Sequence, residues 1–141
     1  MKTFDDVSSA MPSHAVAGIW ILVVDDEAAV RRFTVRVLER EGYGVREAAD
    51  GAEALELLKQ GGITVELVVT DIVMPRLNGV ELMQALSLSH PGLPVILMSG
   101  YATGALVELG IATPCAILPK PFLSERLLEE VRRCCAPKKV G

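Results

Sequence analysis

The sequence predicts an α/β domain in which helices cover both faces of a parallel β-sheet. Apolar runs of strand length alternate with segments of helical periodicity along the chain. Such alternation is typical of parallel sheets with right-handed crossover connections. A single reversal of winding then favours the strand order 2-1-3-4-5, that of a flavodoxin-like three-layer (βα)5 sandwich. With 141 residues, half of them hydrophobic, the chain has the size of one domain and can bury a core without disulfides or metals.

Three strands and two helices are expected in the first half of the chain. Residues 19–24 are apolar throughout, as in a strand that is buried on both faces. Val30, Phe33, Val37 and Leu38 recur at helical spacing and should form the apolar face of the first helix. The expected order is strand 19–24, helix 27–41, strand 43–48, helix 51–62 and strand 65–71.

The second half continues the alternation. Leu82, Met83 and Leu86 fall on one face of the helix after the third strand, and Leu127 and Val131 do so in the last helix. The helix expected between the fourth and fifth strands carries Gly104 and has a poor helical pattern. The expected order is helix 80–90, strand 93–99, helix 102–110, strand 115–118 and helix 123–135.

One domain should account for nearly the whole chain. We assign residues 1–17 to a flexible N-terminal tail, residues 18–136 to the domain and residues 137–141 to a C-terminal tail. The C-terminal tail is too short for a DNA-binding effector domain. We therefore expect a stand-alone domain.

Charge and composition argue against several classes of function. The formal net charge is −4 with both signs interspersed, whereas a nucleic-acid binder would show a clustered basic face. The N-terminal segment lacks the apolar stretch of a signal peptide, and no apolar run reaches the length of a membrane span. We therefore expect a cytoplasmic protein that binds neither nucleic acid directly nor membranes. Of the three cysteines, Cys134 and Cys135 are expected on the apolar face of the last helix rather than as a redox pair.

Polar residues stand where four of the expected strands end. Asp25 and Asp26 follow the first strand, and Asp71 ends the third. Ser99 ends the fourth strand, and Lys120 follows the fifth. Because the carboxyl ends of parallel strands share one edge of the sheet, these residues should meet there. Crowded carboxylates repel one another, and a hard divalent cation such as Mg²⁺ would relieve that repulsion. A carboxylate nucleophile beside Mg²⁺, a lysine and a hydroxyl group predicts that Asp71 becomes an aspartyl phosphate.

Each of these residues also has a purely structural interpretation. The acids after the first strand, Glu27 included, could cap the following helix. Asp71 could cap the turn before Pro75, Ser99 could begin a turn, and Lys120 could be a surface lysine. These interpretations are independent of one another, whereas the functional one needs all the groups at one edge. We therefore favour the functional interpretation.

The chain resembles the receiver domains of two-component response regulators over about residues 19–135. The matching motifs are VVDDE (23–27), TDIVMP (70–75) with Gly79 after it, LMSGY (97–101) and LPKPF (118–122). The resemblance implies a phosphorylation-activated switch rather than an enzyme that turns over a substrate. A histidine kinase or a histidine phosphotransfer protein would donate the phosphoryl group, and an unidentified downstream protein would respond.

The resemblance also implies roles for individual residues. Asp71 would accept the phosphoryl group, Lys120 would contact its oxygens, and Ser99 would move toward them after transfer. The bond between Lys120 and Pro121 matches a position where receivers carry a cis peptide. The implied Mg²⁺ ligands are Asp26, Asp71, the backbone carbonyl of Val73, and Asp25 either directly or through water.

Departures from the receiver pattern concern the signalling step. Receivers usually carry an aromatic switch residue three positions before the lysine, and here that residue is Ile117. Tyr101, in the loop after the fourth strand, is the candidate to replace it. Gly104, Gly110 and Pro114 are poor choices for a regular helix in the segment that belongs to the usual output face.

Three alternatives stay open. A phosphatase of the haloacid-dehalogenase type, with an Asp nucleophile and Mg²⁺, needs a second acid where this chain has Val73. A flavodoxin-like electron carrier needs a phosphate-binding loop after the first strand, where Asp25, Asp26 and Glu27 would repel a phosphate. Within the receiver interpretation, the chain could be a receiver cut from a hybrid histidine kinase, because LMSGY and LPKPF resemble those receivers.

Overall fold

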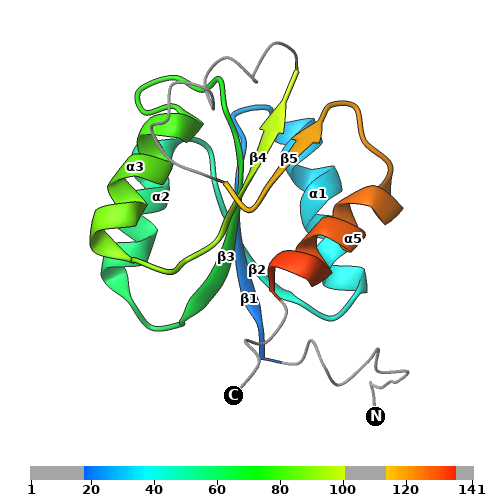
Figure 1. The fold of residues 1–141 in the computed structure, drawn as a ribbon, viewed down its shortest axis with the longest axis horizontal. Coiled ribbons are helices and arrows are strands. Elements are labelled where there is room, and N and C mark those ends of the chain that lie inside the picture. The colour runs from blue at the N-terminus through cyan, green and yellow to red at the C-terminus, as the bar shows by residue number, and fades with distance from the viewer. Residues whose placement is uncertain (1–17, 101–113, 136–141) are drawn as a thin grey trace.

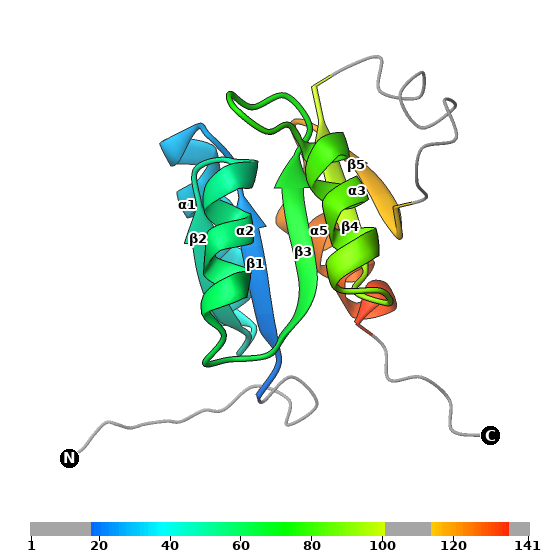
Figure 2. The same ribbon diagram turned by 90° about the vertical axis from the view of Figure 1, so that its left-hand side faces the viewer.

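The fold is a parallel five-stranded sheet with helices on both faces (Figure 1). A computed structural model describes residues 18–100 and 114–135. Helices α1 (Ala28–Arg40) and α5 (Ser124–Cys134) cover one face of the sheet, and α2 (Gly51–Gln60) and α3 (Gly79–Ser89) cover the other (Figure 2). The strands are β1 (Trp20–Val24), β2 (Gly44–Ala48), β3 (Val65–Asp71), β4 (Val95–Ser99) and β5 (Ala116–Pro119). Their order, β2-β1-β3-β4-β5, confirms the predicted fold class.

The described elements match the expected ones to within a residue or two at each end. The helix expected at 102–110 lies outside the described residues, as do the segments that we assigned to tails. The division into tails and domain stays a prediction. Among the described residues, no helix combines the length and the apolar character needed to cross a bilayer.

The register of the sheet aligns the ends of the central strands. Val24 of β1 lies opposite Thr70 of β3, so the residues that follow, Asp25 and Asp71, are level with each other. On the other side of β3, Asp71 lies opposite Met98. Ser99 in turn lies opposite Pro119, directly before Lys120. The pairing therefore brings the predicted polar residues to one edge.

Two apolar layers hold the sheet between its helices. Because successive side chains of a strand point to opposite faces, Ile21 and Val23 pack under α1 and α5, whereas Leu22 and Val24 pack under α2 and α3. All four are fully buried. Burial on both faces explains why this strand is a continuous apolar run rather than an alternating one.

The apolar face predicted for α1 is wrong in one respect. The buried residues of α1 are Thr34, Val35 and Leu38, whereas 45% of Phe33 is exposed. Thr34 can be buried because its hydroxyl donates a hydrogen bond to the carbonyl of Val30, at 3.0 Å. The ring of Phe33 instead lies near that of Phe122, with 6.1 Å between ring centroids.

A disulfide joins Cys115, just before β5, to Cys134 at the end of α5. We had not expected this pair. Cys134 and Cys135 do pack against the core, as expected, and are not bonded to each other. Burial raises the pKa of the Cys135 thiol to about 11. It therefore stays protonated near neutral pH and is a poor nucleophile for exchange with the neighbouring disulfide.

We expect the disulfide to stabilise the oxidised protein. It closes a loop with a sequence separation of 19, and loss of such a cross-link lowers the free energy of unfolding by about 3 kcal/mol. Cys115→Ser should show this loss in urea denaturation without reductant, and reductant should lower the stability of the unchanged protein equally. Cys115→Ser itself should not respond to reductant. An unchanged protein whose denaturation midpoint ignores reductant would contradict the expectation.

Candidate functional site

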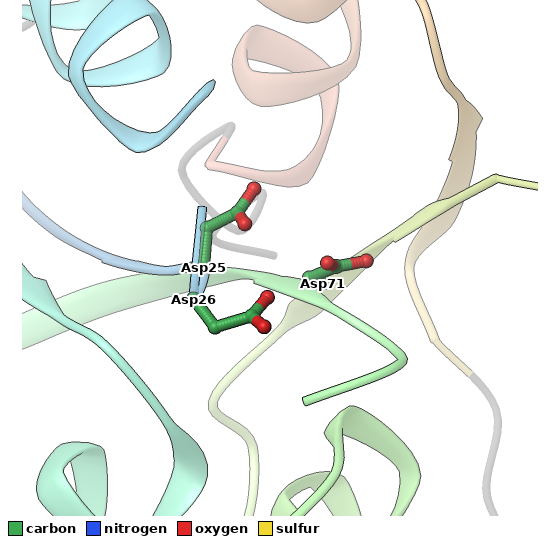
Figure 3. Close-up of side chains that lie close together, drawn as sticks. All are labelled: Asp25, Asp26 and Asp71. Atoms are coloured by element: carbon green, nitrogen blue, oxygen red, sulfur yellow. The ribbon is translucent and has the colours of Figure 1, made fainter. Parts of the chain in front are cut away.

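Three carboxylates meet where β1 and β3 end (Figure 3). Asp25 is fully buried, Asp26 is exposed, and Asp71 is 8% exposed. Each offers a carboxylate oxygen, and these oxygens lie within 4.8 Å of one another. Asp25 accepts a hydrogen bond from the backbone N–H of Glu27 at 2.9 Å, and Asp71 accepts one from that of Ile72 at 2.8 Å. Backbone donors therefore fix two of the three carboxylates.

Lys120 brings a positive charge into this cluster. Its Nζ lies 3.1 Å from Oδ2 of Asp25 and 3.2 Å from Oδ2 of Asp71. Glu27 is a more distant third partner, at 3.9 Å. The backbone N–H of Lys120 donates to the carbonyl of Ser99 at 2.7 Å, and the peptide bond to Pro121 is cis, as the resemblance implied. The ammonium group thus bridges the two buried acids.

The cluster shifts the pKa values of its buried members. Burial raises the pKa of the Asp71 carboxyl despite the opposing charge of Lys120, and the charge of Asp25 adds to the rise. Burial alone would lower the pKa of Lys120, but its hydrogen bond to Asp25 and the charges of both acids outweigh burial and raise it. Lys120 is therefore an ammonium ion at neutral pH.

The raised pKa of Asp71 predicts a pH dependence of stability. A carboxyl whose pKa is higher in the folded than in the unfolded protein binds more protons when folded. The free energy of unfolding therefore falls as pH rises through its titration. In metal-free protein this loss begins near the ordinary value of 3.8 and is complete above the raised pKa. Asp71→Asn, which does not titrate, should gain stability relative to the unchanged protein over this range. Urea denaturation in EDTA at a series of pH values measures the difference, and a pH-independent difference would contradict the argument.

An open recess of about 420 Å³ lies over the carboxylates of Asp26 and Asp71. Val73, which is 78% exposed, lines it from the loop after β3. Ser99 ends β4 and is 4% exposed. The recess is lined by Asp26, Glu27, Asp71, Ile72, Val73, Gly100 and Lys120. A small anionic group could reach Asp71 through this opening.

The structure tests the purely structural roles considered for Glu27 and Lys120, and it shows where Ile117 lies. Glu27 is the N-cap of α1, yet among the described residues no side-chain hydrogen bond caps that helix. Lys120 is only 16% exposed in its side chain, so it is not a surface lysine. Ile117 is partly buried and packs against the apolar layer under α2 and α3. Tyr101, its suggested replacement, lies outside the described residues.

The chemistry of the donor set fits a hard divalent cation. Carboxylate oxygens are the ligands that Mg²⁺ prefers, and two of these three acids are already held in place by backbone hydrogen bonds. Asp26 is exposed to the recess, which leaves room for water ligands. The site could therefore hold Mg²⁺ next to a reacting phosphoryl group.

Sequence reasoning missed several residues that support the site. Arg31 of α1 donates to the backbone carbonyl of Asp25 at 2.7 Å and pairs with Glu47 at 3.0 Å. Arg76, in the loop after β3, pairs with Asp50. The sequence offers no signal for these pairs, because each joins segments that only the fold brings together.

Comparison with known proteins agrees with the geometry. The response regulator receiver domain family matches residues 21–132. The receiver protein CpdR of Brucella abortus is 34% identical over 114 residues, which make up 80% of this chain and 93% of CpdR. The sensor kinase CckA of the same organism is 42% identical over 113 residues, or 79% of this chain but 12% of that kinase. The response regulator MprA of Mycobacterium sp. is 39% identical, and the chain spans 48% of it.

Solved structures show the same fold. The receiver domain of NtrX from Brucella abortus superposes with a TM-score of 0.74 at 32% identity, covering 82% of this chain and 97% of that one. The chemotaxis regulator CheY4 of Vibrio cholerae gives a TM-score of 0.73 at 27% identity, covering 82% and 98%.

Proposed function

Since the chain belongs to the family of response regulator receiver domains, we propose that it is a switch in which Asp71 accepts a phosphoryl group from a phosphohistidine. One observation carries the proposal: Asp71 lines an open recess, close to the carboxylates of Asp25 and Asp26 and to the ammonium group of Lys120. That arrangement supplies a nucleophile, ligands for a cation and a positive charge for the incoming oxygens.

The transfer exchanges one bond to phosphorus for another. A carboxylate oxygen of Asp71 attacks the phosphorus, an O–P bond forms, and the N–P bond to the donor histidine breaks. The histidine nitrogen leaves with the electron pair of that bond. Lys120, which pairs with Asp71 at 3.2 Å before transfer, can then pair with the phosphoryl oxygens instead. Ser99, at the end of β4, would move toward those oxygens and carry the change into its loop.

Asp25, Asp26 and Asp71 would hold Mg²⁺, together with the backbone carbonyl of Val73. When bound, the ion would neutralise charge on the phosphoryl oxygens. The backbone N–H of Glu27 and the ammonium group of Lys120 hold the buried carboxylate of Asp25 in place. Asp25 would therefore add negative charge to the metal site without having to move.

The function is tested by labelling with a small phosphodonor. Acetyl phosphate should add one phosphoryl group to the protein when Mg²⁺ is present and none when EDTA removes it. A phosphomonoester should not be turned over, because the phosphatase alternative lacks its second acid at Val73. Steady release of phosphate from the monoester would favour the phosphatase, and labelling that ignores EDTA would contradict the metal site.

A second recess suggests where the protein donor binds. It measures about 440 Å³, is mainly apolar, and lies between α1 and the segment that joins β5 to α5. Glu27 and Lys120 belong to both recesses, so a protein seated in the second one would stand beside the acceptor. Its apolar lining is Ala29, Val30, Phe33, Pro121 and Phe122. We assign this surface to the histidine-containing donor.

Replacing Phe33 by alanine is expected to separate the two kinds of donor. Transfer from a phosphorylated histidine kinase or phosphotransfer protein should slow about tenfold, the loss of a moderate interface contact. Labelling by acetyl phosphate should be unchanged, because Phe33 does not line the recess over Asp71. Leu88→Ala, at an equally apolar but 86% exposed position on α3, is the control. Equal slowing with both donors would contradict the assignment.

The chain is similar both to a stand-alone receiver protein and to the receiver part of a sensor kinase. We propose that its downstream partner is a protein that recognises the phosphorylated state, and that the chain has no direct role in binding nucleic acid or membranes. We propose that the phosphoryl transfer takes place in the cytoplasm, where the disulfide between Cys115 and Cys134 would be reduced.

A further inference from the structure

An ion pair joins the loop between β3 and α3 to the start of α2. Arg76 lies in this loop, and its guanidinium group faces the carboxylate of Asp50, directly before α2. Nε donates to Oδ2 at 2.9 Å, and Nη2 donates to Oδ1 at 3.0 Å. Nη2 also lies 2.8 Å from Oδ2, so the guanidinium group contacts both carboxylate oxygens and fixes the orientation as well as the distance between the segments.

Both partners are constrained by their own surroundings. Asp50 is the N-cap of α2 and accepts from the backbone N–H of Glu53 at 2.8 Å, so its carboxylate cannot follow a moving arginine. That backbone hydrogen bond is the main reason why the pKa of Asp50 is lowered, and Arg76 contributes to it. Arg76 has a φ of 68°, the one positive value among the described non-glycine residues. Its backbone is thus held in a conformation that arginine seldom adopts.

A second contact lies beside the ion pair. The backbone N–H of Gly51 donates to the carbonyl of Leu77 at 3.2 Å. A Cβ at position 51 would lie 2.6 Å from that oxygen, so the approach requires glycine. Two neighbouring residues of the loop, Arg76 and Leu77, therefore contact two neighbouring residues at the start of α2, Asp50 and Gly51.

The ion pair between Arg76 and Asp50 holds the loop that carries two of the expected metal ligands. Val73 precedes Arg76 in the same loop, and the loop starts at Asp71. The segment before Asp50 also contacts the site, because the backbone N–H of Asp25 donates to the carbonyl of Ala48, at the end of β2. We propose that Arg76 and Asp50 are positioning residues that hold the β3–α3 loop so that its ligands face Mg²⁺. This inference rests on the proposed function.

A merely structural ion pair would behave differently. The Arg76 side chain is 64% exposed, and exposed pairs add little to stability. A bare charge effect also has a distinct signature: removal of the arginine would tighten Mg²⁺ binding, whereas removal of the aspartate would weaken it. Positioning predicts that both changes weaken binding. The signs therefore separate the two explanations.

The test is Mg²⁺ titration followed by the backbone NMR shifts of residues 25, 26 and 71. Arg76→Gly removes the ion pair and relieves the positive φ, so the variant should fold. Asp50→Asn keeps an acceptor for the α2 cap but loses the charge. Each should raise the dissociation constant for Mg²⁺ about tenfold, as loss of an outer-shell partner does in other metal sites. The double variant should be no worse than either single one, because both remove the same contact.

Two further variants complete the design. Arg76→Lys keeps the charge without the fork and should give an intermediate affinity. Arg126→Gln removes an exposed ion pair with Glu130 on α5 and should leave Mg²⁺ affinity unchanged. Unchanged affinity in both Arg76→Gly and Asp50→Asn, or tighter binding in Arg76→Gly, would overturn the inference. No Mg²⁺ binding by the unchanged protein would remove the proposed metal site itself, and the positioning role with it.

Discussion

Replacing Asp71 by asparagine is expected to abolish phosphoryl acceptance. The amide is not a nucleophile at phosphorus, and it brings no negative charge to the cluster that would hold Mg²⁺. Intact-mass measurement after incubation with acetyl phosphate and Mg²⁺ should show one added phosphoryl group on the unchanged protein and none on the variant. Glu56→Gln, which neutralises an exposed carboxylate on α2, should label normally.

The loss in Asp71→Asn should not come from unfolding. Burial raises the pKa of Asp71, so its ionised form is held at a cost that the neutral amide avoids. The variant should therefore denature at least as late as the unchanged protein in EDTA. A variant that folds and still takes up one phosphoryl group would show that another residue is the acceptor.

Replacing Gly79 by alanine should have the largest effect on stability near the site. A Cβ at this position would overlap the carbonyl oxygen of Asp71 and lie 2.9 Å from the Cα of Ile72. The approach is close because the backbone N–H of Gly79 donates to the carbonyl of Ile72 at 2.8 Å, which seats α3 against the acceptor. Overpacking of the alanine Cβ against this backbone should lower the free energy of unfolding by about 3 kcal/mol. Urea denaturation measures the loss.

Gly100→Ala is the matched control, because a Cβ there meets no atom of the described residues within 4 Å. Its change in stability should stay within about 0.5 kcal/mol. Gly79→Ala should also label more slowly with acetyl phosphate, since the acceptor backbone has to shift. Equal stability of the two variants would mean that α3 can move away from Asp71 without cost.

Much of the fold follows from the sequence because the buried strands are long apolar runs. β1 is apolar on both faces, and a single reversal of winding places β1 beside β3, so their polar successors share one edge. Asp25, Asp71 and Lys120 were predicted together for that reason, and the structure brings them within ion-pair distance. Local pattern and topology were sufficient here.

The remaining features depend on packing between distant segments. Phe33 fits the helical period of α1 yet stands half exposed, because Thr34 satisfies its own hydroxyl and can take the buried place. The partner of Cys134 could not be read from spacing, since the β5–α5 connection brings Cys115 to it. Arg76 and Asp50 belong to different crossover units, and their spacing follows no local period.

The central claim, that Asp71 is the phosphoryl acceptor, is tested most directly by mapping the modified residue. Sodium borohydride reduces an aspartyl phosphate to homoserine, so the site is recorded as a changed residue in a peptide. After phosphorylation with Mg²⁺, we predict homoserine at position 71 and unchanged aspartate at positions 25 and 26. Homoserine at position 25 or 26, or a labelled protein without homoserine at position 71, would contradict the claim.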